Sequence, residues 1–217
     1  MTALDLPAEK HAVLERTLSL DEKQRASHIR FSLDRGRWVK SRGLLRIILS
    51  QYLGLRPNEI SFTDDQLDIE DFNHGSQLFF SLSHTQGWAI YAVAANCRIG
   101  VDIEVMEALP ELEPIIQRYY SDREAKWLRS LPDSERLLWF YRIWTGKEAV
   151  LKAVRKGITQ DLRKVEIGLD VDQKPQVLNI EDVSSGWSLQ LLSPAENVVG
   201  MLAVPGSMRP IRYWQLD

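Results

Sequence analysis

A seven-residue stretch from Ile99 to Val105 constrains the fold of this chain more than any other. Its sequence, Ile-Gly-Val-Asp-Ile-Glu-Val, alternates apolar and acidic side chains. On a β-strand this alternation places the apolar residues on one face and both Asp102 and Glu104 on the other. The stretch therefore predicts a strand with one buried face and with two carboxylates that point the same way.

A second stretch, from Trp144 to Lys152, predicts a helix with charged residues in register. Glu148 and Lys152 are four residues apart and therefore share one helical face. If this face meets the acidic strand, three carboxylates and an ammonium group surround one point. Carboxylate oxygens are the ligands that Mg²⁺ prefers, and a neighbouring cation suits a phosphate or pyrophosphate. The two stretches together predict a metal-dependent phosphate site.

Each stretch also has a purely structural interpretation. Asp102 and Glu104 could form the solvent side of an edge strand. Thr145 and Glu148 fit a capping box at a helix start, and Glu148 with Lys152 fits an i,i+4 pair worth roughly 0.2 to 0.5 kcal/mol. These interpretations leave the basic and polar residues elsewhere in the chain unexplained, so we favour the phosphate site.

Composition excludes several classes of function. The chain has 217 residues, of which 44% are hydrophobic and 26% charged, as in an ordinary folded protein. Its net charge of −3 argues against nucleic acid as a partner. No apolar run approaches the roughly 20 residues that cross a bilayer, so we expect no membrane partner. Cys97 is the single cysteine, which excludes an intrachain disulfide and favours a cytoplasmic location.

The order of predicted elements repeats along the chain. In the first part, helices are predicted at 8–18, 21–29 and 37–53, and strands at 78–83, 88–95 and 99–105. In the second, helices are predicted at 121–131 and 133–156, and strands at 165–169, 187–192, 198–204 and 211–214. The repetition predicts an α+β fold of two pseudosymmetric halves, residues 1–105 and 106–217, with the site at their interface.

Two further groups of residues would surround a phosphorylated ligand. Basic residues gather on and just before the helix at 37–53, and they are Arg30, Arg35, Arg37, Lys40, Arg42 and Arg46. Ser83 and His84 lie at a predicted strand end, in a loop that closes at Gly87, where side chains can meet a ligand. The structural alternative is a solvated helix face and ordinary turn residues.

Three of these segments resemble the successive motifs of the 4′-phosphopantetheinyl transferases of the Sfp type. They are Phe80-Ser-Leu-Ser-His84, Ile99-Gly-Val-Asp-Ile-Glu104 and Trp144-Thr-Gly-Lys-Glu-Ala-Val-Leu-Lys152, and with the basic helix the resemblance covers residues 30 to 157. Enzymes of this family move the phosphopantetheine arm of coenzyme A onto a serine of a carrier protein. The resemblance implies the two-half α+β fold of the family, with coenzyme A between the halves.

The resemblance also implies a role for each candidate residue. Asp102, Glu104 and Glu148 would bind Mg²⁺, and Glu148 would deprotonate the carrier serine. Lys152 would hold the pyrophosphate and stabilise the leaving 3′,5′-ADP. The other candidates would bind coenzyme A. Ser83 and His84 would contact its phosphates, and its adenosine end would be surrounded by Arg30, Arg37 and Arg42. The Gly-Lys-Pro motif of many relatives is absent between Thr63 and Phe72, which leaves open what contacts the 3′-phosphate.

The partners that the resemblance implies are coenzyme A and an apo acyl or peptidyl carrier protein, with the enzyme as a monomer. We expect the carrier to dock after Glu104, on exposed apolar anchors at Leu109, Leu112, Ile115 and Ile116 with a cationic rim of Arg118, Arg123, Lys126 and Arg129. In the alternative, these apolar residues pin the connection between the halves. Other functions left open are a non-catalytic binding module for coenzyme A or carrier protein and a metal-dependent phosphodiester hydrolase. The pathway of the carrier, and Mg²⁺ against Mn²⁺, are open as well.

Overall fold

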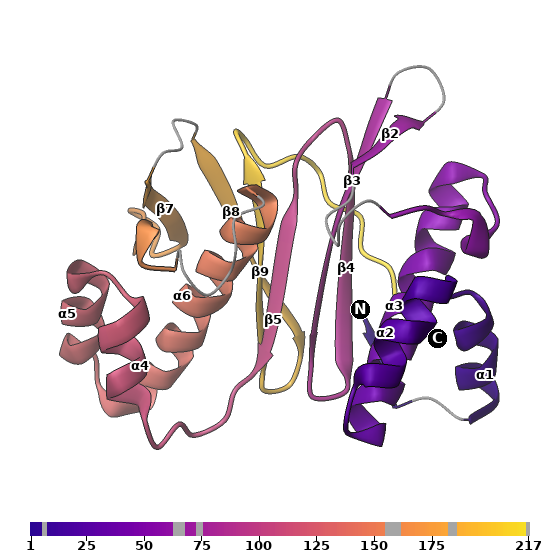
Figure 1. Ribbon diagram of the computed structural model, residues 1–217. Helices are drawn as coiled ribbons and strands as arrows, with labels where there is room; N and C mark the ends of the chain where they lie inside the picture. Colours follow the sequence, from indigo (N-terminus) through magenta and orange to yellow (C-terminus); the bar gives the residue numbers. More distant parts are fainter. Residues whose placement is uncertain (6–7, 63–67, 73–75, 155–161, 182–185, 216–217) are drawn as a thin grey trace.

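The chain folds into two α+β halves that lie side by side, each with a long helix packed on an antiparallel sheet (Figure 1). The computed structural model describes residues 1–5, 8–62, 68–72, 76–154, 162–181 and 186–215. The α+β architecture predicted from the order of elements is therefore confirmed.

The N-terminal half consists of three helices against a four-stranded sheet of order β1-β4-β3-β2. Its elements are β1 (Thr2–Ala3), α1 (Ala8–Arg16), α2 (Leu20–His28), α3 (Ser32–Leu53), a 3-10 helix (Pro57–Glu59), β2 (Asp68–Phe72), β3 (Ser76–Thr85) and β4 (Trp88–Ala95). Leu45, Leu49 and Leu53 of α3 form a core with Leu78 and other apolar residues of β3 and β4. The long helix ends at Gly54, which adopts a left-handed φ of +67° that glycine accepts without strain.

The C-terminal half places a second long helix across a three-stranded sheet of order β5-β9-β8, beside a two-stranded β6-β7 sheet. Its elements are β5 (Gly100–Val105), α4 (Leu112–Tyr119), α5 (Asp122–Ser130), α6 (Asp133–Val154), a 3-10 helix (Leu162–Lys164), β6 (Val165–Leu169), β7 (Pro175–Ile180), β8 (Trp187–Ala195) and β9 (Val198–Pro205). The acidic strand β5 pairs with β9, so it belongs to the sheet of this half.

Several expectations about individual elements were wrong. The predicted strand at 211–214 has no strand pairing; instead Met208 and Ile211 pack on an apolar cluster around Val101, and the Trp214 carbonyl accepts a hydrogen bond from the N-terminal amine of Met1. Residues 112–119, for which no helix or strand was predicted, form α4. The strand β7 was not predicted, because Pro175 and polar residues obscure its pattern.

The hairpin between β3 and β4 is tighter than expected. Its turn is Gln86-Gly87, and both residues have positive φ, +36° and +86°. Two such residues make a type I′ turn, which matches the twist of the paired strands. His84 therefore lies within β3, paired with Ala89, rather than in a loop.

Candidate active site

A glycine brings the acidic strand and the long C-terminal helix into direct contact. A Cβ atom at Gly100 would lie 1.8 Å from the Ala149 carbonyl oxygen and 2.8 Å from the Ala153 nitrogen, both in α6. Because side chains alternate along a strand, Gly100, Asp102 and Glu104 share the face that meets α6. The missing side chain lets the backbone of α6 lie against β5, so the next residues on that face meet the charged face of the helix.

Asp102 and Lys152 form an ion pair at this contact. The Lys152 Nζ atom lies 2.6 Å from Asp102 Oδ1 and also donates to the Val101 carbonyl oxygen at 3.3 Å. Asp102 is only 2% exposed, so it is not on the solvent side of an edge strand. Thr145 lies inside α6, where its hydroxyl donates to the Tyr141 carbonyl at 2.9 Å, so the capping-box interpretation is also wrong.

Burial and neighbouring charges raise the pKa values of Glu148 and Glu104. Burial, and then the negative charge of Asp102, raise the pKa of Glu148 to about 8, although Lys152 opposes this shift. Burial and the charge of Asp102 also raise the pKa of Glu104. The three carboxyl groups from two motifs thus lie close enough to influence one another, as the sequence predicted.

The N-terminal half contributes hydroxyl groups to these carboxylates. Ser83 Oγ donates to Asp102 Oδ1 at 2.6 Å, and Thr85 Oγ1 donates to Glu104 Oε2 at 3.0 Å. The sequence motifs indicated Ser83 but not Thr85. The available signal was the alternation of Ser81, Ser83 and Thr85, which puts three hydroxyl residues on one face of β3.

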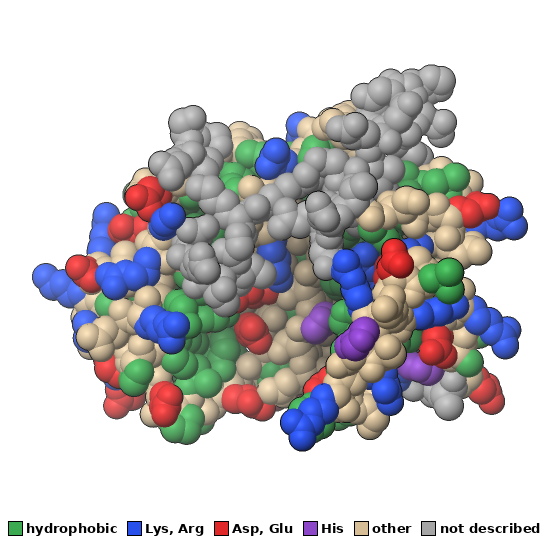
Figure 2. Space-filling view, viewed as in Figure 1, with side chains coloured by type: hydrophobic (Ala, Val, Ile, Leu, Met, Phe, Trp, Pro, Cys, Tyr) green, Lys and Arg blue, Asp and Glu red, His purple; other side chains and the backbone are tan. Residues whose placement is uncertain are grey.

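His84 belongs to the opposite set of β3 side chains and is exposed. Partial desolvation by the surrounding protein, and then the positive charge of Lys152, lower the pKa of His84. In the space-filling view, acidic and histidine side chains gather around a hollow between the two halves (Figure 2). The charge of Lys152 thus acts on His84, which connects the first motif, Phe80–His84, electrostatically to the other two.

The three arginines predicted to bind coenzyme A have different surroundings. Arg37 pairs with Asp5 at 3.2 Å. Arg42 pairs with Glu22 at 2.5 Å and lies over the Phe62 ring. Arg30 lies over the ring of its neighbour Phe31, 5.5 Å from the ring centroid.

The basic face of α3 is also less solvated than its pattern indicated. Arg46 is 1% exposed and donates to Glu22 and to two backbone carbonyl oxygens, those of Pro57 and Ile60. Arg42 and Arg46 therefore hold α2, α3 and the following 3-10 helix together. A role for Arg30, Arg37 and Arg42 in ligand binding stays a prediction.

The apolar residues expected as exposed docking anchors pack inward. Ile116 is fully buried, and Leu109, Leu112 and Ile115 are partly buried against the same core of the C-terminal half. Ile116 is therefore not an exposed anchor. Docking of the carrier on this face stays a prediction. The basic residues nearby are partly neutralised, since Arg129 pairs with Glu113 and Arg123 lies 3.7 Å from Glu166.

The carboxylates fit a hard cation in their chemistry. Asp102 Oδ2 is buried, and no hydrogen-bond partner for it was found among the described residues. Such an oxygen is suited to a metal ion, because an unpaired buried acceptor is costly. In the side-chain positions described, however, no three His, Cys, Asp or Glu residues are grouped so that they could hold a metal. Binding of one ion by Asp102, Glu104 and Glu148 therefore stays a prediction.

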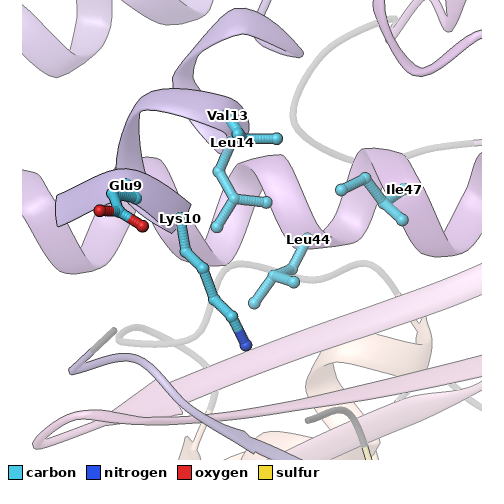
Figure 3. Close-up of a pocket in the computed structure, with 6 residues that line it drawn as sticks. All are labelled: Glu9, Lys10, Val13, Leu14, Leu44 and Ile47. Atoms are coloured by element: carbon cyan, nitrogen blue, oxygen red, sulfur yellow. The ribbon is translucent and has the colours of Figure 1, made fainter. Parts of the chain in front are cut away.

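A separate pocket of about 330 Å³ lies between α1 and α3 (Figure 3). It is lined by Glu9, Lys10, Val13, Leu14, Leu44 and Ile47. None of these residues belongs to the three motifs, so the pocket is distinct from the candidate active site.

Among the residues that the structure describes, no helix has the length and apolar character that crossing a membrane requires.

Comparisons with known proteins identify the family. Residues 98–202 match the family model described as the 4′-phosphopantetheinyl transferase superfamily. The 4′-phosphopantetheinyl transferase HetI of Nostoc sp. is 36% identical over 214 residues, which cover 97% of this chain and 88% of that protein. The 4′-phosphopantetheinyl transferase psf-1 of Bacillus pumilus is 28% identical over 159 residues, which cover 73% of this chain and 67% of that protein.

A solved structure was also matched, that of a holo-(acyl-carrier-protein) synthase from Bacillus anthracis in complex with CoA (3′,5′-ADP). It is 22% identical with a TM-score of 0.42, and the match covers 52% of this chain and 98% of that chain. The similarity to HetI extends over nearly the whole sequence. The chain therefore belongs to the 4′-phosphopantetheinyl transferase superfamily and is an enzyme of that family, as its motifs predicted.

Proposed function

We propose that this enzyme transfers the 4′-phosphopantetheine arm of coenzyme A to a serine of an apo acyl or peptidyl carrier protein, with Mg²⁺, and releases 3′,5′-ADP. The observation that supports the proposal most strongly is the meeting of Asp102, Glu148 and Lys152 where β5 touches α6. Carboxylates and a cation at one point suit a reaction at a pyrophosphate, where positioning and electrostatic stabilisation supply most of the catalysis.

In the proposed reaction the carrier serine attacks the phosphorus atom that bears the pantetheine arm. A bond forms between the serine oxygen and this phosphorus, and the bond to the bridging pyrophosphate oxygen breaks. The bridging oxygen leaves as part of 3′,5′-ADP, and Glu148 accepts the serine proton. The pKa of about 8 belongs to the metal-free site. Bound Mg²⁺ would lower it, because metal and proton compete for the carboxylate, and would keep Glu148 deprotonated.

The other residues of the site would bind and orient the substrate. When bound, Mg²⁺ would neutralise charge on the pyrophosphate oxygens, and Asp102, Glu104 and Glu148 would hold it. Lys152, already directed at Asp102 Oδ1, would stabilise the charge that develops on the leaving group. The remaining candidates would contact coenzyme A, and they are Ser83, His84, Arg30, Arg37 and Arg42.

The wider organisation of the enzyme follows from the same proposal. We infer that the two halves, predicted as residues 1–105 and 106–217, act as two domains with coenzyme A between them. The boundary lies before β5 and not after it, because β5 pairs with β9 in the sheet of the second half. The hydroxyl contacts from β3 to Asp102 and Glu104 support this arrangement, because each half then completes the other's site. We further infer a monomeric enzyme in the cytoplasm, where Cys97 would stay reduced.

One transfer assay distinguishes this function from the other two. Coenzyme A labelled in its pantetheine arm is incubated with the enzyme, Mg²⁺ and an apo carrier protein, and the label is followed on the carrier and in free phosphopantetheine. We expect label on the carrier and release of 3′,5′-ADP. Release of free phosphopantetheine without labelled carrier would instead establish a hydrolase, and binding without turnover would establish a binding module.

Variants connect the assay to the site. Asp102→Ala should abolish transfer, whereas Asp172→Ala, which removes an exposed carboxylate in the turn between β6 and β7, should leave it unchanged. Near-normal turnover of the Asp102 variant at limiting Mg²⁺ would show that the proposed site is wrong.

A further inference from the structure

Three hydroxyl side chains connect the two halves at the site. Ser81, Ser83 and Thr85 lie on one face of β3, which belongs to a different sheet from β5. Ser81 Oγ accepts a hydrogen bond from the Val101 backbone N–H at 3.0 Å. Ser83 and Thr85 then donate to the next two polar side chains of β5, at 2.6 and 3.0 Å. Side-chain contacts therefore align the two strands in this region.

Thr85 occupies the most constrained place in this series. It pairs with Trp88 directly before the type I′ turn, whose geometry defines where the strand ends. The Gly87 carbonyl accepts a hydrogen bond from the Leu4 N–H at 2.6 Å. The turn is therefore held from both sides, by the β3-β4 ladder and by Leu4, the residue after β1.

An ion pair lies beside Gly87 and leaves little room for a side chain there. A Cβ atom at Gly87 would lie 2.8 Å from Asp5 Oδ2 and 3.1 Å from a guanidinium nitrogen of Arg37. These two side chains are themselves paired at 3.2 Å. The Thr85 hydroxyl thus projects from a strand end that backbone hydrogen bonds hold on both sides, as a group that orients another side chain requires.

The Thr85 hydroxyl matters more for the position of the Glu104 carboxylate than the Ser83 hydroxyl does for that of Asp102. Asp102 Oδ1 accepts hydrogen bonds from both Ser83 and Lys152. For Glu104, the donation from Thr85 is the one side-chain hydrogen bond found among the described residues. Loss of the Ser83 hydroxyl would leave Asp102 its ion pair, whereas loss of the Thr85 hydroxyl would release Glu104.

We propose that Thr85 is a positioning residue that holds Glu104 beside Asp102 for a divalent cation, an inference that rests on the proposed function. A hydroxyl that orients a ligating carboxylate acts through the ligand and not on the substrate. Removal of such outer partners typically lowers metal affinity by about 10- to 100-fold. Thr85 would therefore affect metal binding and leave coenzyme A binding largely unaltered.

Direct metal binding tests the proposal without substrate. Binding of Mn²⁺ alone is measured by electron paramagnetic resonance for the wild type, Thr85→Val and Thr85→Ser. The control is Thr17→Val, because the Thr17 hydroxyl donates to the Leu14 carbonyl at 2.6 Å, at the end of α1. We expect Thr85→Val to bind Mn²⁺ at least about tenfold more weakly than the wild type. Thr85→Ser and Thr17→Val should bind it within twofold of the wild type. Thr85→Ala replaces Thr85→Val if the latter fails to fold. Unchanged affinity in the folded variant without the hydroxyl would overturn the proposal.

Two further readouts separate this inference from the function on which it rests. Thr85→Val should raise the metal concentration for half-maximal transfer, with less than a twofold change in the KM for coenzyme A. A rise in that KM without a change in metal dependence would contradict a positioning role. Asp102→Ala should lose Mn²⁺ binding. If Asp102→Ala binds Mn²⁺ normally, the proposed metal site is wrong. If Asp102→Ala loses Mn²⁺ binding and Thr85→Val does not, the metal site stands and only the role of Thr85 is wrong.

Discussion

Lys152 Nζ lies 2.6 Å from Asp102 Oδ1, although the two residues are 50 positions apart in the chain. This ion pair connects α6 to β5, and therefore connects two of the three sequence motifs. Asp102 is almost completely buried, so the pair is less exposed to solvent screening than a surface ion pair. It also orients the ammonium group towards the carboxylates that we propose as metal ligands.

Lys152→Ala should lower kcat by about ten- to a hundredfold, because a contact to a charged group contributes roughly 1.5 to 3 kcal/mol. The KM for coenzyme A should change less, since the charge that Lys152 stabilises develops in the transition state. Steady-state kinetics with a carrier protein measures both constants. Lys174→Ala removes an exposed ammonium group of the β6-β7 hairpin and provides the control. A larger change in KM than in kcat would assign Lys152 to ground-state binding.

In the metal-free enzyme, Glu148 should contribute progressively less stability as the pH rises from about 4.5 to about 8. Glu148 has a pKa of about 8 in the folded protein against an ordinary value of 4.5, so the folded state holds its proton over this range while the unfolded state loses it. Thermal unfolding in a chelating buffer measures the effect. The midpoint of Glu148→Gln should fall less over this interval, and the difference between the two proteins should be constant above pH 8. Parallel curves for both proteins would refute the raised pKa.

Mg²⁺ should bind more tightly as the pH rises towards 8. The carboxyl group of Glu148 must lose its proton to act as a ligand, so metal and proton compete for it. Isothermal titration of the enzyme with Mg²⁺ at pH 6, 7 and 8 measures this competition. Glu148→Gln should bind weakly at each pH and with a smaller pH dependence. Equal pH dependence in the two proteins would remove Glu148 from the set of ligands.

Gly100→Ala should destabilise the fold and reduce activity together. The new Cβ atom would overlap the Ala149 carbonyl oxygen, which is backbone and can yield only if α6 moves away from β5. Overpacking of this kind typically costs about 1 to 3 kcal/mol. Gly36→Ala is the matched control, because nothing lies within 4 Å of its added Cβ atom and alanine favours a helix. Urea denaturation measures both, and a Gly100 variant as stable as wild type would contradict the close contact.

Lys147→Met should cost about 3 to 5 kcal/mol of stability, since it leaves the buried carboxylate of Glu124 without its cationic partner. The two side chains are 2.6 Å apart and almost fully inaccessible to solvent. Lys147 also donates to the carbonyl oxygens of Tyr119 and Leu162, so the variant loses contacts to α4 and to the 3-10 helix. Denaturation midpoints in urea measure the loss. A cost below about 1 kcal/mol would show that the pair adds little to folding.

Local sequence patterns determined much of this protein. The alternation in β5 defined which side chains share a face, and the spacing of Glu148 and Lys152 defined their common helical face, because both periods follow from backbone geometry. Capping residues were equally informative. Ser19 and Ser121 begin α2 and α5 with capping boxes, as polar side chains before a helix indicate. The motifs also identified the family, which the similarity to HetI establishes independently.

Only the tertiary structure decided which elements meet. The Thr85 hydroxyl reaches Glu104 because two sheets from different halves face each other, and no local pattern encodes that distance. Ile116 and Arg46 are buried although their segments looked exposed, since burial depends on what packs against a residue. His84 was predicted in a loop but lies in β3, because the turn consists of only two residues, Gln86 and Gly87. Periodicity is a property of neighbouring residues, whereas a site between two halves is a property of their packing.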